Sequence, residues 1–188
     1  MENETKTKGK GKTQKTSAAA ENAVTPTSVG AEERKKFTAK DVDLSQIITV
    51  LNGFHGVLTY KSKRTGEEFR WEDFGDEQDM ELSELRNARN SHKKFFQNNW
   101  FMFYPEDMWV VDFLGLSREY KYALPVDGFD DLFDMDPDEV TETLSNMTKG
   151  QKRSVSYRAK QLIAEGAIDS NRVISALEKG LNTTLVER

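Results

Sequence analysis

Residues 46–75 read QIITVLNGFHGVLTYKSKRTGEEFRWEDFG, and this stretch decides the fold class of the chain. Gln46–Asn52 is apolar and β-branched, while Val57–Ser62 and Glu68–Phe74 alternate between two faces. β-Branched and aromatic residues with a period of two are typical of strands. Glycine-bearing turns between such strands favour antiparallel pairing of neighbours. The pattern therefore predicts an antiparallel β-meander.

Between residues 83 and 115 the sequence predicts two short helices and one strand. Ser83 is placed to cap the first helix, and Pro105 and Gly115 are placed to begin and end the second. Trp100–Tyr104 is a run of aromatic residues and methionine, which is typical of a buried strand.

From Asp136 onward the spacing of apolar residues is helical. Asp136 begins a first helix that Gly150 ends, and a second helix runs to Gly166. Asp169 is placed to cap a third helix. The apolar stripe of this third helix consists of Val173, Ile174, Leu177, Leu181 and Leu185. The sequence thus predicts an α+β protein, in which a small antiparallel β-sheet is followed by a C-terminal three-helix unit.

Residues 1–36 differ in composition from the rest of the chain. They are rich in Lys, Thr, Ser, Ala, Gly and Glu and contain no aromatic residue. Such a segment cannot bury enough apolar surface to offset the entropy lost on ordering, so it is predicted to be a disordered, lysine-bearing tail. We expect residues 37–126 to hold the β-meander with two short helices, and residues 127–188 to form a helical unit packed on the same domain.

The charge of the chain is unevenly distributed. Its net charge is −5, but residues 1–36 carry eight Lys/Arg against five Asp/Glu, which leaves −8 on the remainder. Within that remainder, Asp127–Glu142 holds eight acids and no base, and Lys149–Lys160 holds five bases and no acid. An acidic body repels nucleic acid, so contacts with phosphate are expected only from the tail or the basic stretch.

Composition excludes several classes of protein. The chain has no cysteine, which excludes disulfide scaffolds and cysteine-ligated metal centres. No apolar run approaches the roughly 20 residues that span a membrane, and the N-terminus lacks the apolar stretch of a secretory signal. We therefore expect a soluble protein that is made in the cytoplasm and has no membrane contact.

No motif of catalysis is present. His55 lies in a turn and His92 follows a short helix, and both are expected to be turn or surface residues. The motifs that activate a nucleophile, hold zinc or cradle phosphate do not occur. We expect no enzyme, no cofactor and no small-molecule substrate.

Three features leave alternatives open. Asp130, Asp134, Asp136 and Asp138 have the oxygen ligands of a hard cation, but an acidic solvated surface is favoured because the spacing is not that of a calcium loop. Trp109 lies one residue off an apolar stripe and is either a core residue or a half-exposed interface anchor. The last two helices resemble a helix-turn-helix, yet a packed helical hairpin is favoured since the second helix offers few basic or amide side chains.

Three segments carry a resemblance to a known group of proteins. They are VLTYKSKRTGEEFRWEDFGDEQDMELSELRNAR (57–89), FFQNNWFMFYPED (95–107) and AKQLIAEGAIDSNRVISALEKGL (159–181). In their order, over about residues 42–185, they resemble small accessory and virion-associated proteins of tailed bacteriophages of Gram-positive hosts. The resemblance implies a non-enzymatic protein, made in the host cytoplasm, that assembles with other phage proteins in a head, neck, tail or baseplate.

The sequence therefore favours a structural or assembly protein that acts through protein–protein contacts as a homo- or hetero-oligomer. The alternative is a nucleic-acid-binding or host-directed regulatory protein that uses the basic tail and residues 149–160. The candidate contact residues are Lys6, Lys8, Lys10, Lys12, Lys15, His55, Trp109, Asp130, Asp134, Lys152, Arg153 and Arg158.

Overall fold

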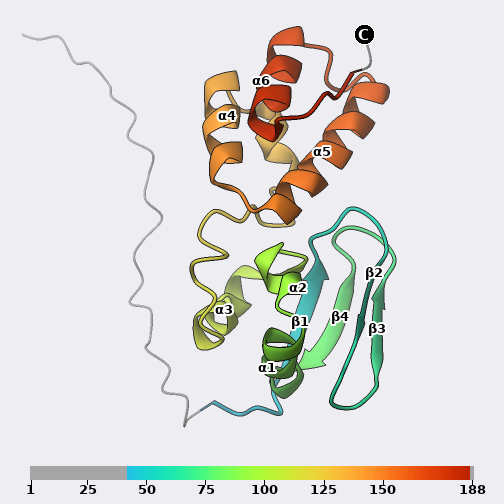
Figure 1. Cartoon of the computed structure of the whole chain (residues 1–188), viewed down its shortest axis with the longest axis vertical. Helices are drawn as coiled ribbons and strands as arrows, with labels where there is room; N and C mark the ends of the chain where they lie inside the picture. Colours follow the sequence, from blue (N-terminus) through green and yellow to red (C-terminus); the bar gives the residue numbers. More distant parts are fainter. Residues whose placement is uncertain (1–41, 187–188) are drawn as a thin grey trace, which may run out of the picture. The chain divides into compact units, whose positions relative to one another are not determined.

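The first strand of the chain lies at the centre of the larger sheet. In the computed structural model, which describes residues 42–186, β1 (Ile47–Asn52) pairs antiparallel with both β4 (Glu77–Glu81) and β5 (Phe101–Phe103) (Figure 1). Val50 lies opposite Gln78 on one side and Phe103 on the other. The predicted tail, with Lys6, Lys8, Lys10, Lys12 and Lys15, lies outside the described residues.

A separate hairpin forms the second sheet. β2 (Leu58–Lys61) pairs antiparallel with β3 (Glu68–Trp71), so that Tyr60 lies opposite Phe69. This pairing agrees with the prediction, but the expected meander is wrong at β1, which pairs with neither β2 nor β3. The reason is that the buried residues Val50 and Leu51 have backbone partners on both edges, in β4 and β5, which leaves no edge of β1 there for the hairpin.

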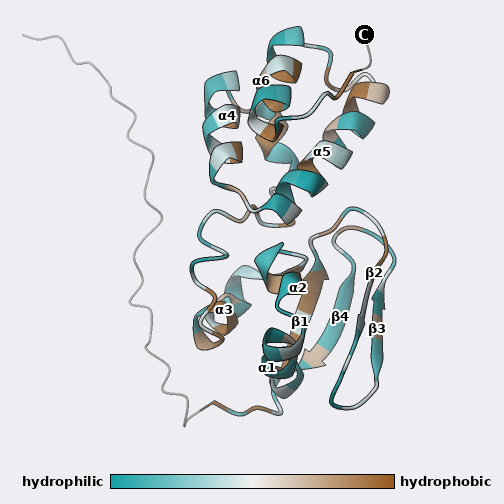
Figure 2. Ribbon diagram, in the orientation of Figure 1, coloured by the Kyte–Doolittle hydropathy of each residue, from teal (hydrophilic) through white to brown (hydrophobic). Residues whose placement is uncertain are grey.

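β4 is the strand that the sequence pattern does not reveal. Its sequence is EQDME, and only Met80 is buried. Figure 2 shows the contrast between hydrophobic β1 and mainly hydrophilic β4. Because β4 lies at the edge of its sheet, pairing with β1 rather than its own composition makes it a strand.

The first hydrophobic core joins the two sheets to α1 (Leu82–Ser91) and α2 (Lys94–Gln97). Trp71 is fully buried, and its indole Nε1 donates a hydrogen bond of 2.9 Å to the carbonyl oxygen of Val50. This bond ties the hairpin to the larger sheet. Ser83 does not cap α1: the N-cap is Glu81, and the Ser83 hydroxyl donates to the Glu81 carboxylate.

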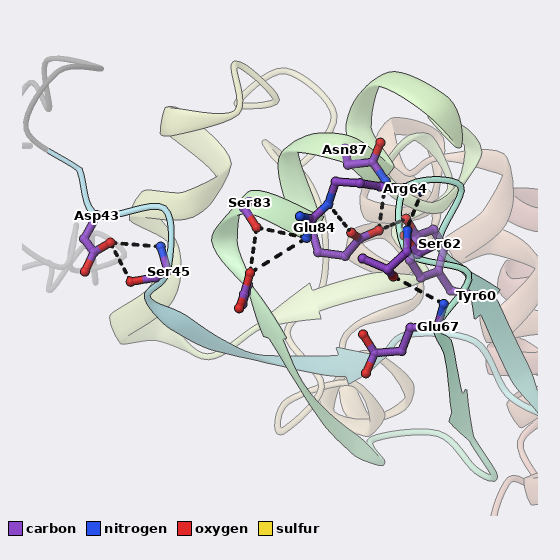
Figure 3. A network of polar contacts seen from close by, with 11 residues as sticks. Asp43, Ser45, Tyr60, Ser62, Arg64, Glu67, Ser83, Glu84 and Asn87 are labelled. Atoms are coloured by element: carbon purple, nitrogen blue, oxygen red, sulfur yellow. Dashed lines mark hydrogen bonds and ion pairs between the residues drawn. The ribbon is translucent and has the colours of Figure 1, made fainter.

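A buried carboxylate holds the hairpin against α1 (Figure 3). Glu84 is 3% exposed and accepts hydrogen bonds from Tyr60 Oη at 2.6 Å, Asn87 Nδ2 at 2.9 Å and Arg64 Nε at 3.1 Å. Burial alone would raise the pKa of Glu84, but these bonds, together with one from Ser62, outweigh it and the pKa is lowered. The carboxylate is therefore buried with its partners in place, which is the condition under which a buried charge is tolerated.

The expected helix from Pro105 to Gly115 is split in two. Pro105–Asp107 forms a 3₁₀ turn, η1, and Trp109–Phe113 forms a short helix, α3. Gly115 ends the segment as predicted, with φ at +69°. Trp109 is partly buried against the first core, so it is not a fully buried core residue, and its role as an interface anchor stays a prediction.

The C-terminal part is helical, which confirms the α+β class. The 3₁₀ turn η2 (Asp130–Asp134) precedes α4 (Pro137–Asn146), α5 (Lys149–Ala164) and α6 (Asn171–Leu181) (Figure 1). Their shared core includes Leu132, Val140, Leu144, Val155 and Leu177, all fully buried. α6 packs closely on α4, since a Cβ atom at Gly180 would lie 2.6 Å from a methyl group of Leu144.

Three helix boundaries differ from the prediction. Asp136 caps α4 as expected, accepting from the Asp138 amide at 3.1 Å, but α4 ends at Asn146 and not at Gly150. The N-cap of α6 is Ser170 and not Asp169. Leu185 lies beyond α6 because Asn182 adopts φ of +53° and turns the chain back, and the Leu185 amide then donates to Glu178.

Gly150 has a different role from the predicted one. It lies in the first turn of α5, which Thr148 caps by accepting from the Gln151 amide at 3.2 Å. A Cβ atom at residue 150 would lie 2.2 Å from Asn98 Cβ and 2.3 Å from the Asn98 carbonyl oxygen. Glycine is therefore required for close approach between α5 and the loop after α2.

We expect Gly150→Ala to destabilise the protein by at least about 2 kcal/mol, measured by urea denaturation. Alanine normally favours a helix over glycine by about 1 kcal/mol, so the sign of the effect reports the clash with Asn98. Gly66→Ala is the control, because no atom lies within 4 Å of its added Cβ and only the φ of +79° is unfavourable. A Gly150→Ala protein as stable as the wild type would contradict the close contact.

Candidate functional site

Four of the six buried polar residues of the described chain lie where the first turns of α5 meet loops of the sheet-containing part. They are Asn52, Asn99, Gln151 and Ser154, and we call this region the seam. Across it, Ser154 Oγ donates to the Gly53 carbonyl at 3.0 Å and Thr148 Oγ1 donates to Asn99 Oδ1 at 2.8 Å. Gln151 Nε2 donates to the Leu124 carbonyl at 3.1 Å. Because buried polar groups are costly unless paired, these bonds fix how α5 meets the loops.

The loop 53–56 at the seam is shaped by the side chain of Asn52. Its amide nitrogen donates to the carbonyl oxygens of Gly56 at 2.9 Å and Asp73 at 2.8 Å, and its oxygen accepts from the Phe54 amide at 2.9 Å. Gly56 completes the turn with φ of +135°. The loop is thereby held rigidly, and it carries His55.

His55 lies among aromatic rings contributed by three other segments. Its imidazole stacks on Phe74 with ring centroids 4.1 Å apart and planes 2° from parallel. Phe129 lies at 5.2 Å and Tyr157 of α5 at 5.9 Å. These rings line an open cavity of about 520 Å³, which we call the seam pocket.

Charged side chains form the rest of the seam pocket. Asp73, Asp127 and Asp130 line it together with Arg158. The Arg158 guanidinium binds Asp130 through Nε, at 3.0 and 3.1 Å from the two carboxylate oxygens, and through Nη2. The hydrogen bonds to Asp130 raise the pKa of Arg158. The pocket thus holds three carboxylates and one guanidinium, of which one pair is mutually neutralised.

The imidazole of His55 is neutral at pH 7. Burial, followed by repulsion from Arg158, lowers its pKa to about 4, although Asp130 and Asp73 act in the opposite direction. Its Nε2 atom is buried and has no hydrogen-bond partner among residues 42–186. The residues that line the pocket include no serine, threonine or cysteine for such a base to activate.

The structure brings together His55, Asp130 and Arg158 of the predicted contact residues. His55 occupies a turn as expected but is half-buried. Trp109 lies elsewhere, on α3. Asp134 and Arg153 are exposed and Lys152 is half-buried, and these three do not line the seam pocket.

His92 is also outside the seam pocket. Its Nδ1 lies 2.9 Å from the Ser91 hydroxyl, and its ring meets Tyr60 edge to face at 5.3 Å.

The sequence did not predict five residues of the seam pocket, which are Asp73, Phe74, Asp127, Phe129 and Tyr157. The detectable signal was Tyr157, a large aromatic residue at helical spacing within a basic stretch.

Tyr157 also belongs to a basic face of α5. Lys149, Arg153, Tyr157 and Lys160 follow one another at helical spacing and are all exposed, and we call them the α5 face. Tyr157 is 60% exposed, more than any other large hydrophobic side chain of residues 42–186. On η2 and α4, Asp134, Asp138, Glu139 and Glu142 are exposed and form what we call the acidic face. Within the described chain, the ion pair between Asp130 and Arg158 is the only one that links the acidic residues 127–142 to the basic residues 149–160.

Two further observations bear on ligands. Among residues 42–186, no group of three or more His, Asp or Glu side chains is placed to hold a metal ion. None of the helices described for this chain is both long enough and apolar enough to cross a membrane.

Comparison of the chain with protein-family models, curated proteins and solved structures finds no match. The relation to bacteriophage proteins therefore stays a prediction.

We expect the stability of the protein to fall as the pH is lowered from about 6.5 towards about 4, with His55 a main cause. The pKa of His55 is lower in the folded state than in the unfolded state, so the unfolded chain binds the proton first. The protein therefore keeps its full stability above the pKa that His55 has in the unfolded chain. It loses stability as the pH falls from there towards the pKa of His55 in the folded protein. Urea denaturation between pH 7 and pH 5 measures the loss.

His55→Leu should flatten this pH dependence, because leucine does not titrate. His92→Gln should keep most of it, because the lowering of the pKa of His92 is the smaller of the two. Parallel curves for the wild type and His55→Leu would show that His55 is not the group responsible.

Proposed function

We propose that this chain is a non-enzymatic assembly protein that acts through protein–protein contacts. The observation that carries the proposal is the α5 face, in which a 60% exposed tyrosine lies between basic side chains. A large aromatic residue in that position is a typical anchor of a protein interface. The bases around it select a partner surface that is acidic.

The chain itself offers such a surface. The acidic face on η2 and α4 has the opposite charge, and its side chains are exposed. Because the α5 face and the acidic face are different surfaces of one molecule, contact between copies is heterologous, head to tail. The resemblance to virion-associated phage proteins supplies the setting of this proposal, a phage particle in which such contacts repeat.

The charged side chains and the tyrosine contribute differently to the free energy of association. An exposed ion pair contributes only about 0–1 kcal/mol, so the charges set orientation, specificity and association rate. Burial of Tyr157 supplies the apolar contribution, for which a hot-spot tyrosine typically accounts for about 2 kcal/mol.

Sedimentation measurements of mass over a wide range of protein concentration test the proposal. We expect the wild type to associate reversibly at low salt. Arg153→Glu with Lys160→Glu, and separately Glu139→Lys with Glu142→Lys, should each abolish association. An equimolar mixture of the two variants should restore it as a hetero-oligomer, because each then presents the charge that the other requires.

Two further variants separate the charge and the tyrosine. Lys63→Glu with Lys93→Glu makes the same change of charge on exposed residues away from α5 and should leave association unchanged. Tyr157→Ser should weaken association about 30-fold, the equivalent of about 2 kcal/mol. A wild type that stays monomeric at every concentration would overturn self-assembly.

A second candidate function, nucleic-acid binding, is favoured by one feature of the same helix. From Lys149 to Lys160 the sequence contains five bases and no acid, and Tyr157 is exposed for stacking. Against it, residues 37–188 carry a net charge of −8.

Fluorescence anisotropy with a labelled single-stranded DNA separates the two candidates. Under the assembly proposal we expect no binding at physiological salt. Binding that weakens steeply with rising salt and is lost in Arg153→Glu with Lys160→Glu would establish the second candidate instead.

A further inference from the structure

The seam pocket has the dimensions of a ligand site. Its volume of about 520 Å³ falls within the range of roughly 300–1,000 Å³ that is usual for such sites. Its walls come from the loop 53–56, the turn at residues 73–74, residues 126–130 and α5. Segments far apart in the sequence therefore converge on one cavity.

The charge of the pocket favours a cation. Arg158 is held by Asp130, which leaves Asp73 and Asp127 without an ion-pair partner among residues 42–186. Three carboxylates and one guanidinium sum to −2, and His55 adds no positive charge at neutral pH. A phosphate or carboxylate ligand would be repelled, and a cationic group would be attracted.

The aromatic walls favour an organic cation over a metal ion. Phe74 and Tyr157 flank His55, and Tyr157 keeps most of its surface open to solvent. Aromatic faces attract a cation that lies within about 6 Å of the ring centre, and they also pack well against the methylene groups of lysine and arginine. Hard metal ions prefer cages of oxygen ligands, which residues 42–186 do not provide.

The pocket is also built in advance. Asn52 holds the loop that carries His55, and Ser154 ties that loop to α5 through the Gly53 carbonyl. Little conformational freedom remains in these walls to be lost on binding.

We propose that the seam pocket binds a basic side chain, the ammonium of lysine or the guanidinium of arginine, presented by a partner polypeptide. The carboxylates of Asp73 and Asp127 hold the charge, and Tyr157 and Phe74 contact the stem. This site shares Tyr157 with the α5 face, but the carboxylates that hold the charge, those of Asp73 and Asp127, belong to neither the α5 face nor the acidic face.

The test is an NMR titration of the ¹⁵N-labelled full chain with N-acetyl-lysine methylamide and N-acetyl-arginine methylamide. We expect saturable shifts at His55, Asp127 and Tyr157, with dissociation constants of the order of millimolar, and weaker binding at high salt. The uncharged analogues with norleucine and citrulline side chains should cause no saturable shift.

A pair of matched variants locates the site. Asp73→Asn with Asp127→Asn should weaken lysine binding about ten-fold, since each carboxylate contributes about as much as an exposed ion pair. Glu68→Gln with Glu106→Gln removes the same charge from exposed residues elsewhere and should leave binding unchanged. Asn at residue 73 keeps the oxygen that accepts from the Phe74 amide, so the local turn is retained.

Three outcomes would overturn the proposal. Equal binding of norleucine would show an apolar pocket, and shifts that the Asp73→Asn, Asp127→Asn variant does not alter would show diffuse attraction to an acidic surface. The third is the absence of saturable shifts in the wild type and also in a full chain in which the eight Lys and Arg residues of residues 1–36, which could compete for the pocket, are replaced by glutamine.

Binding at the seam pocket and association through the α5 face can be tested independently of each other. Asp73→Asn with Asp127→Asn should leave sedimentation unchanged, whereas Arg153→Glu with Lys160→Glu should abolish association without weakening lysine binding.

Discussion

The close approach of α5 to the loop after α2 is the contact on which the rest of the structure depends. Gly150 meets the backbone of Asn98 at a distance that no side chain permits, and Thr148 bonds to Asn99 beside it. That approach brings Ser154 within reach of the Gly53 carbonyl and Tyr157 within reach of His55. A side chain at residue 150 would move α5 outward, and the seam pocket would lose the wall that carries Tyr157 and Arg158.

The seam is polar, and this has a physical consequence. Hydrogen bonds that replace bonds to water add little net stability, but each is directional, and a shifted α5 would leave several buried groups unpaired. Apolar contacts between the two cores would tolerate sliding far better. The polar groups of the seam therefore specify how α5 is placed, while the apolar cores of the two parts supply most of the stabilisation.

The sequence predicts elements whose signal is local. β1, the β2–β3 hairpin and the cap at Asp136 are found as expected, because alternation and capping act over a few residues. It fails where a tertiary contact decides: β4 is a strand through its pairing with β1, and Gly150 is a contact glycine rather than a helix end. His55, Asp130 and Arg158 were singled out by residue type. Their contact in space could not be predicted from the sequence, because His55 and Asp130 are 75 positions apart and Asp130 and Arg158 are 28 positions apart.

His55 is the point at which the local rules conflict. A buried nitrogen without a partner is unfavourable, and an apolar residue of similar size would avoid that cost. The surrounding rings and Arg158 keep the imidazole neutral, so it supports an aromatic wall without opposing a cation at the nearby carboxylates. A purely structural position would be filled more stably by leucine or phenylalanine. A position that must stack on Phe74 beside the carboxylates of the seam pocket is better served by a flat, polar, uncharged ring.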